Sequence, residues 1–134
     1  MAKYKKKLDA DIRCPLEYGL TIFGGKSGEY PQKLYKALMT SQTVLTVWDD
    51  ARLVGLIRVL DDSEMLAQIH YVLVHPEYQG QGIAGRMVEY IKEKYKNFMY
   101  LELMPEDKNN VPFYEKHGFH VMENGAAMQI CNIN

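Results

Sequence analysis

Residues 72–86 join an apolar segment to an amphipathic one through a turn that has glycines at positions 80 and 82. The segment before the turn, Met65–Val74, ends in a nearly continuous apolar run, which is typical of a strand buried on both faces. The segment after the turn continues to about Lys96 with apolar residues at helical spacing, namely Ile83, Met87, Val88, Ile91 and Tyr95. A strand, a glycine turn and a helix in this order favour a sheet that carries helices on its faces.

The residues before this unit predict an antiparallel meander. Pro31 begins a predicted helix that runs to about Met39. Strands are predicted at Thr43–Trp48 and Leu53–Leu60, joined by a hairpin turn at residues 49–52. A second turn at residues 61–64 leads into Met65–Val74, so three consecutive strands alternate in direction.

The residues after the helix predict a parallel pair of strands. Phe98–Met104 reads as a strand, and a strand–helix–strand unit of this length implies a right-handed crossover. A short helix is expected at about Asn110–Lys116, ended by Gly118. Phe119–Val121 and Ala126–Cys131 are predicted to form a final hairpin. The fold class is therefore mixed α/β.

The N-terminal 30 residues give the weakest pattern. Leu20–Phe23 is compatible with a short strand, and the basic run at residues 3–7 is interpreted as a solvated, partly frayed end. With 134 residues, we expect a single domain over residues 1–134. Cys14 and Cys131 have no metal or redox spacing, which suggests a reducing compartment. No segment resembles a signal peptide or a membrane helix, so a cytoplasmic location is expected.

The glycine turn is a candidate anion site, because glycines allow close backbone approach and a helix N-terminus presents unpaired N–H groups. The G-x-G-x-x-G spacing of dinucleotide-binding folds is met by glycines 80, 82 and 85. The preceding meander and the lack of an acidic residue ending the next strand argue against that fold. A P-loop at Gly25-Lys26-Ser27 would need glycine where Leu20 stands.

A third motif fits better. Gln79-Gly-Gln-Gly82-Ile-Ala84 matches Q-x-x-G-x-A, and Phe113-Tyr-Glu-Lys-His-Gly-Phe119 matches F-Y-x-x-x-G-F, some 30 residues later. In these two motifs, and from about Val44 to Met128, the chain resembles the GNAT superfamily of N-acetyltransferases. The resemblance implies a mixed sheet that splays between its fourth and fifth strands, with helices on both faces. It also implies acetyl-coenzyme A as cosubstrate and no metal.

The same resemblance implies where the cosubstrate binds. Pantetheine would pair with the backbone of the cleft strand, and the pyrophosphate would lie on the glycine turn, with Arg86 either adding charge or facing solvent. The implied binding residues are Val72, Leu73, Val74, Gln79, Gly80, Gln81, Gly82, Ile83, Ala84, Gly85 and Arg86.

Acetyl transfer to an amine requires deprotonation of the amine, a donor for the oxyanion and a proton for the departing thiolate. The resemblance makes Tyr114 the candidate acid and a backbone amide near Leu73 or Val74 the oxyanion donor. His70 on the cleft strand is one candidate base, since some family members carry histidine at the matching place, and Glu102 on the facing strand is the other.

A second function is a catalytically weak module that senses acyl-coenzyme A or binds a protein; the presence of Tyr114 favours the enzyme. A net charge of −1 and a pI of 6.4 argue against nucleic acid and, mildly, against a strongly cationic acceptor. We expect a small-molecule or peptide amine as acceptor and no membrane partner. A homodimer is compatible with the family.

Overall fold

The computed structural model describes residues 3–5 and 29–133, which form two compact units divided between Leu103 and Met104. The strands of these residues form a five-stranded sheet in the order β1-β2-β3-β4-β5. All neighbours are antiparallel except β4 and β5, which are parallel, so the predicted mixed sheet is confirmed. The strands are β1 (Lys3–Lys5), β2 (Thr43–Asp49), β3 (Arg52–Asp61), β4 (Leu66–Val74) and β5 (Tyr100–Leu103).

The N-terminal prediction is partly wrong. Lys3–Lys5 pair with residues 46–48 of β2 as the edge strand of the sheet, whereas residues 6 and 7 of the basic run lie outside the described residues. The backbone hydrogen bonds that these residues form with β2 stabilise the strand more than hydration of the same backbone groups would stabilise a free end. The predicted strand Leu20–Phe23 lies outside the described residues.

The two turns of the meander follow the sequence prediction. Asp49 and Arg52 are paired across a two-residue turn in which Asp50 adopts a φ of +51°. At the other end of β3, one carboxylate oxygen of Asp62 accepts hydrogen bonds from the backbone N–H groups of residues 64, 65 and 66, at 2.8–3.1 Å. These bonds hold the pKa of Asp62 below its usual range.

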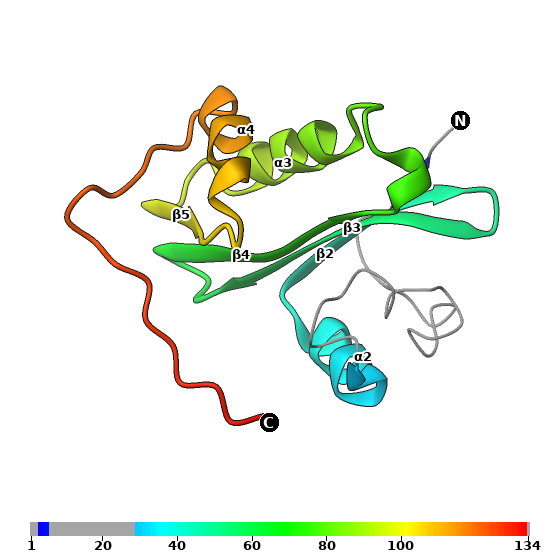
Figure 1. Cartoon of the computed structure of the whole chain (residues 1–134), viewed down its shortest axis with the longest axis horizontal. Coiled ribbons are helices and arrows are strands. Elements are labelled where there is room, and N and C mark those ends of the chain that lie inside the picture. Colours follow the sequence, from blue (N-terminus) through cyan, green and yellow to red (C-terminus); the bar gives the residue numbers. More distant parts are fainter. Residues whose placement is uncertain (1–2, 6–28, 134) are drawn as a thin grey trace. The chain divides into compact units, whose positions relative to one another are not determined.

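Two helices of the first unit lie on opposite faces of the sheet (Figure 1). Helix α2 (Pro31–Thr40) starts at a proline and buries Leu34 and Leu38 against β2 and β3. Helix α3 (Ile83–Lys94) contacts β3 and β4 and buries its predicted apolar stripe. The two helices thus cover the central strands from both sides, as the resemblance implied.

The prediction that β4 is buried on both faces is wrong. Ala67 and Ile69 are buried, but Tyr71–Val74 are only half-buried. The pairing with β5 ends at Leu103 opposite Ile69, so no described strand flanks Tyr71–Val74 on that side, and β5 ends one residue earlier than predicted. At its other end β5 begins at Tyr100 rather than at residue 98, because the N–H of residue 98 donates to the carbonyl of residue 95 in the turn after α3.

The second unit holds a short helix and an irregular segment. A 3₁₀ turn, η4 (Lys108–Asn110), leads into α4 (Val111–Lys116), and Gly118 ends the helix with a φ of +92°, as predicted. The predicted final hairpin is wrong: residues 119–133 contain no strand, although the expected turn forms at residues 122–125. Met128 and Ile130 are 93% and 88% exposed. Alternating apolar residues make a strand only where a partner ladder exists.

Candidate active site

The C-terminal half of β4 has one paired edge. Val72, Leu73 and Val74 pair with β3 on one side, whereas on the other side the parallel pairing with β5 stops at Ile69. No other strand of the described residues pairs with that second edge. An edge of this kind offers backbone N–H and C=O groups to an extended ligand, in the manner of an added strand.

The glycine turn follows this edge directly. Gly80 and Gly82 have φ values of +82° and +80°, which L-residues with side chains rarely adopt. A Cβ atom at either position would meet no atom within 4 Å, so the space beside the turn is open. Gly82 is the N-cap of α3 and makes no side-chain cap. The first N–H groups of α3 are therefore available to an anion.

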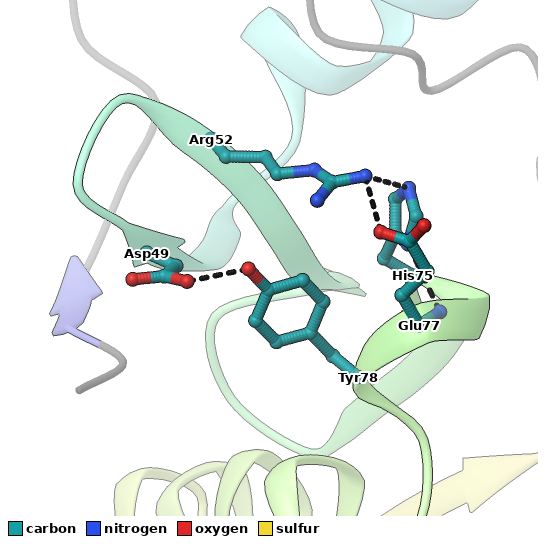
Figure 2. Close-up of polar contacts among 5 residues, drawn as sticks. All are labelled: Asp49, Arg52, His75, Glu77 and Tyr78. Carbon is teal, nitrogen blue, oxygen red and sulfur yellow. Dashed lines mark hydrogen bonds and ion pairs between the residues drawn. The ribbon is translucent and has the colours of Figure 1, made fainter.

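A cluster of five side chains, the loop clasp, ties the segment before the glycines to the β2–β3 turn (Figure 2). It comprises Asp49, Arg52, His75, Glu77 and Tyr78. Tyr78 donates its hydroxyl hydrogen to Asp49, and this bond raises the pKa of the phenol. Arg52 Nη2 lies 2.7 Å from a Glu77 carboxylate oxygen and 3.1 Å from His75 Nε2. The hydrogen bond with Glu77 raises the pKa of Arg52.

Two further contacts fix the same segment. The His75 N–H donates to the carbonyl of Val54 at 2.7 Å, and His75 Nδ1 accepts from the N–H of Glu77 at 3.1 Å. Solvent-exposed ion pairs contribute only about 0–1 kcal/mol to stability. We therefore interpret the loop clasp as orienting η3 (Pro76–Tyr78), and with it the glycine turn, rather than as stabilising the fold.

This cluster could not be predicted from the sequence. Asp49 and Arg52 are turn residues by pattern, and the half-buried His75 follows the end of β4 without any motif that would link it to them. A signal would have required knowing that the β2–β3 turn and the end of β4 lie side by side.

His70 occupies a β-bulge of β4. Arg58 pairs with Tyr71 and Val59 with Ile69, so His70 is the extra residue. Arg58 Nη1 lies 2.6 Å from His70 Nδ1. A guanidinium only donates hydrogen bonds, so Nδ1 is the acceptor and the proton of the neutral ring is on Nε2. In this geometry the basic nitrogen of His70 is already engaged.

Glu102 lies on β5 opposite Gln68 and is half-buried. Ala67 and Ile69, its neighbours across the ladder, are buried on the α3 face, so the alternation of a strand puts Gln68 and Glu102 on the other face of the sheet. This is the face on which α2 covers the neighbouring strands. Glu102 thus remains beside the end of the β4–β5 pairing.

Tyr114 belongs to the second unit. Its ring contacts Phe113 and Phe119, with centroids 5.0 and 5.9 Å away. Burial raises the pKa of its hydroxyl, which therefore stays protonated at neutral pH. Within the described residues this hydroxyl forms no hydrogen bond. Among the described residues it is therefore a half-buried phenol whose O–H group has no acceptor.

The predicted binding residues other than β4 lie at the turn and the first turn of α3. Arg86 is exposed there, and its N–H makes the first helical hydrogen bond, to the carbonyl of Gly82 at 3.1 Å. Gln79 donates from its side-chain amide to the carbonyl of Val74 at 3.3 Å, which links the turn to the strand edge. Among residues 3–5 and 29–133 no three His, Cys, Asp or Glu side chains gather as metal ligands would. None of the helices in that part of the chain is long and apolar enough to cross a membrane.

A family model, a curated relative and solved structures are similar to this chain. The sequence model of the acetyltransferase (GNAT) family matches residues 16–119. A relative from Bacillus methanolicus, an uncharacterized N-acetyltransferase encoded in the lysA 3' region, is 34% identical over 73 residues. That match covers 54% of this chain and 58% of the relative, so it spans little more than half of the relative's length.

Two solved structures extend the likeness over nearly the whole chain. A probable acetyltransferase of unknown function from methicillin-resistant Staphylococcus aureus superposes with a TM-score of 0.83 at 28% identity, covering 98% of this chain and 99% of that one. A GNAT family acetyltransferase from Elizabethkingia anophelis, solved with acetyl-CoA bound, gives a TM-score of 0.68 at 18% identity, covering 90% and 77%. The second likeness concerns the fold alone.

Proposed function

The chain belongs to the acetyltransferase (GNAT) family, and on that premise we propose that it transfers the acetyl group of acetyl-coenzyme A to a primary amine of a small molecule or peptide. The observation that carries the proposal is the glycine turn: two glycines with φ near +80°, open space beside them and a helix N-terminus behind them, directly after an unpaired strand edge. We take residues 1–134 as one acetyltransferase domain.

Acetyl-coenzyme A would bind along these two elements. The pantetheine arm would pair with the backbone of Val72–Val74. The pyrophosphate would lie on residues 79–85 and accept hydrogen bonds from N–H groups that follow Gln79, whose own N–H donates to the carbonyl of Pro76. Arg86, exposed on the first turn of α3, adds positive charge. The acetyl-CoA bound to the Elizabethkingia protein of the same fold supports this choice of cosubstrate.

The reaction needs no covalent enzyme intermediate. The amine attacks the thioester carbonyl directly, and a backbone N–H near Leu73 or Val74 donates to the oxyanion. Tyr114 donates its proton to the departing thiolate, a role suited to a phenol whose burial keeps it neutral. The amine proton passes to Glu102 or His70. The hydrogen bond from Arg58 to His70 Nδ1 favours Glu102, whose carboxylate can only accept.

The alternative is a module that binds acyl-coenzyme A without turnover. Two measurements separate the candidates: calorimetric binding of acetyl-coenzyme A, and release of free thiol from acetyl-coenzyme A across a panel of primary amines. Binding with amine-dependent thiol release supports the enzyme. Binding without release for any amine supports the sensor, and absence of binding overturns both.

A further inference from the structure

Among the residues that the structure describes, the half-buried Arg58 has no carboxylate partner. In the described part of the chain the ion pairs involve Arg52, Lys92 and Lys96, and Arg58 is in none of them. Burial lowers the pKa of its guanidinium. A desolvated charge that no acidic side chain compensates is costly, and such groups are retained where something else pairs with them.

The guanidinium is held in place by neutral groups. Its Nε donates to Ser41 Oγ at 2.7 Å, and its Nη1 lies 2.6 Å from His70 Nδ1. Its Cζ atom lies 5.9 Å from the centre of the Tyr71 ring. Ser41 is itself buried at the C-cap of α2, where its hydroxyl donates to the carbonyl of Ala37 at 2.6 Å. Of the five N–H groups of Arg58, these contacts occupy two, and the orientation of the fork is set.

The position of Arg58 is at the reacting end of the proposed cleft. Its partner across the β3–β4 ladder is Tyr71, which lies next to the bulge and, like Val72–Val74, on the edge of β4 that no described strand pairs with beyond Ile69. Leu56, two residues earlier on β3, packs with Leu34 of α2, so Arg58 lies on the α2 face. Glu102, the favoured base, lies on that same face by strand alternation.

We infer that Arg58 binds an anionic group of the acceptor, so that the substrate is a small molecule carrying both a primary amine and a carboxylate or phosphate. The inference rests on the proposed function and names its substrate class. The amine is directed to Glu102 and the β4 edge, and the anion receives the remaining N–H groups of the Arg58 fork, whose planar geometry suits both carboxylate and phosphate.

The test compares matched pairs of acceptors. β-Alanine is paired with β-alaninamide, 4-aminobutyrate with its amide, and phosphoethanolamine with ethanolamine. Thiol release from acetyl-coenzyme A gives kcat/KM for each. We expect the wild-type chain to favour an anionic member by about 10- to 100-fold, the range of one charge-assisted interaction. The amines of the carboxamides are less basic, so a larger fraction of them is deprotonated and nucleophilic at neutral pH. Intrinsic reactivity therefore favours the neutral acceptors, opposite to the preference expected of the enzyme. The carboxylate and phosphate pairs identify which anion is bound.

Three variants locate the preference. Arg58→Gln should remove it, chiefly through KM, and Arg58→Lys should keep part of it because the charge remains without the fork. Ser41→Ala removes a hydrogen bond of Arg58 but not its charge, and should keep most of the preference if the variant folds. Lys36→Gln removes an exposed cation of α2 as a control for net charge, and should keep all of it.

The outcomes separate this inference from the proposed function. Absence of acetyl-coenzyme A binding would reject the function itself. Binding and turnover with equal rates on anionic and neutral acceptors would leave the function standing and reject the inference. The inference is also overturned if Arg58→Gln keeps the wild-type preference, or if Lys36→Gln loses it equally. If Arg58→Gln does not fold, the preference for anionic acceptors is compared between the wild-type chain and Arg58→Lys, and an undiminished preference in Arg58→Lys overturns the inference.

Discussion

Replacing Tyr114 by phenylalanine removes one hydroxyl from the second unit and leaves its ring. The ring contacts with Phe113 and Phe119 persist in the variant. Because the hydroxyl forms no hydrogen bond within the described residues, no hydrogen bond worth about 0.5–1.5 kcal/mol is lost. We expect the free energy of unfolding to change by less than about 0.5 kcal/mol. Affinity for acetyl-coenzyme A should stay within about threefold, or roughly 0.7 kcal/mol.

Turnover should behave differently from stability. A general acid contributes about 10²–10⁴-fold, or roughly 2.7–5.4 kcal/mol of transition-state stabilisation. Stopped-flow or steady-state thiol release on an accepted amine measures this loss, and chemical unfolding measures stability on the same samples. Tyr90→Phe is the matched control, since Tyr90 is a half-buried tyrosine of α3. A Tyr114→Phe enzyme with full turnover on an accepted amine would refute the assignment, and the thiolate proton would then come from solvent.

Three further predictions concern the first unit. Gly82→Val should weaken acetyl-coenzyme A binding at least tenfold, about 1.4 kcal/mol, in calorimetry, because it fills open space beside the turn and strains a φ of +80°; unchanged affinity in a folded variant would reject the site. His70→Ala and Glu102→Gln separate the candidate bases, since only loss of the true base should lower neutral-pH turnover and remove an ionisation from the acidic limb of the rate profile. Burial, together with its hydrogen bond to Asp61, raises the pKa of Tyr95 to about 12. Stability should therefore be complete below about pH 10, the pKa in the unfolded chain, and fall as the pH rises toward 12; unfolding at about pH 9 and about pH 11.5 tests this, and Tyr95→Phe should lack that loss.

The sequence predicted the features that depend on local chemistry. The glycines at 80 and 82 indicated a turn between strand and helix, and in the structure both lie in such a turn, with positive φ. The apolar stripe of α3 indicated its buried face, and Ile83, Met87, Val88 and Ile91 are buried. The meander followed from short polar turns between β-branched runs. Each of these properties belongs to a few neighbouring residues, so it can be read without knowledge of the rest of the chain.

The features that depend on pairing between distant residues could not be predicted. A bulge is a mismatch of register between two strands, so His70 on its own strand looks like any other residue of β4. The extent of β5 is set by where its ladder with β4 ends, and its apolar pattern overestimated it at both ends. The apolar residues around Ala126–Cys131 suggested a strand, but that segment forms no ladder in the structure.

The loop clasp has a consequence for how the gene can vary. Hairpin turns usually tolerate insertions, because they run over the surface and little depends on their length. Here the two-residue turn separates Asp49 from Arg52, and each of them holds a different residue of η3. One added residue would rotate or shift one partner relative to the other. The β2–β3 turn is therefore a poor place for a peptide tag or a circular permutation, despite its exposure. In related sequences, a turn of this length should occur together with the residues found here at positions 77 and 78.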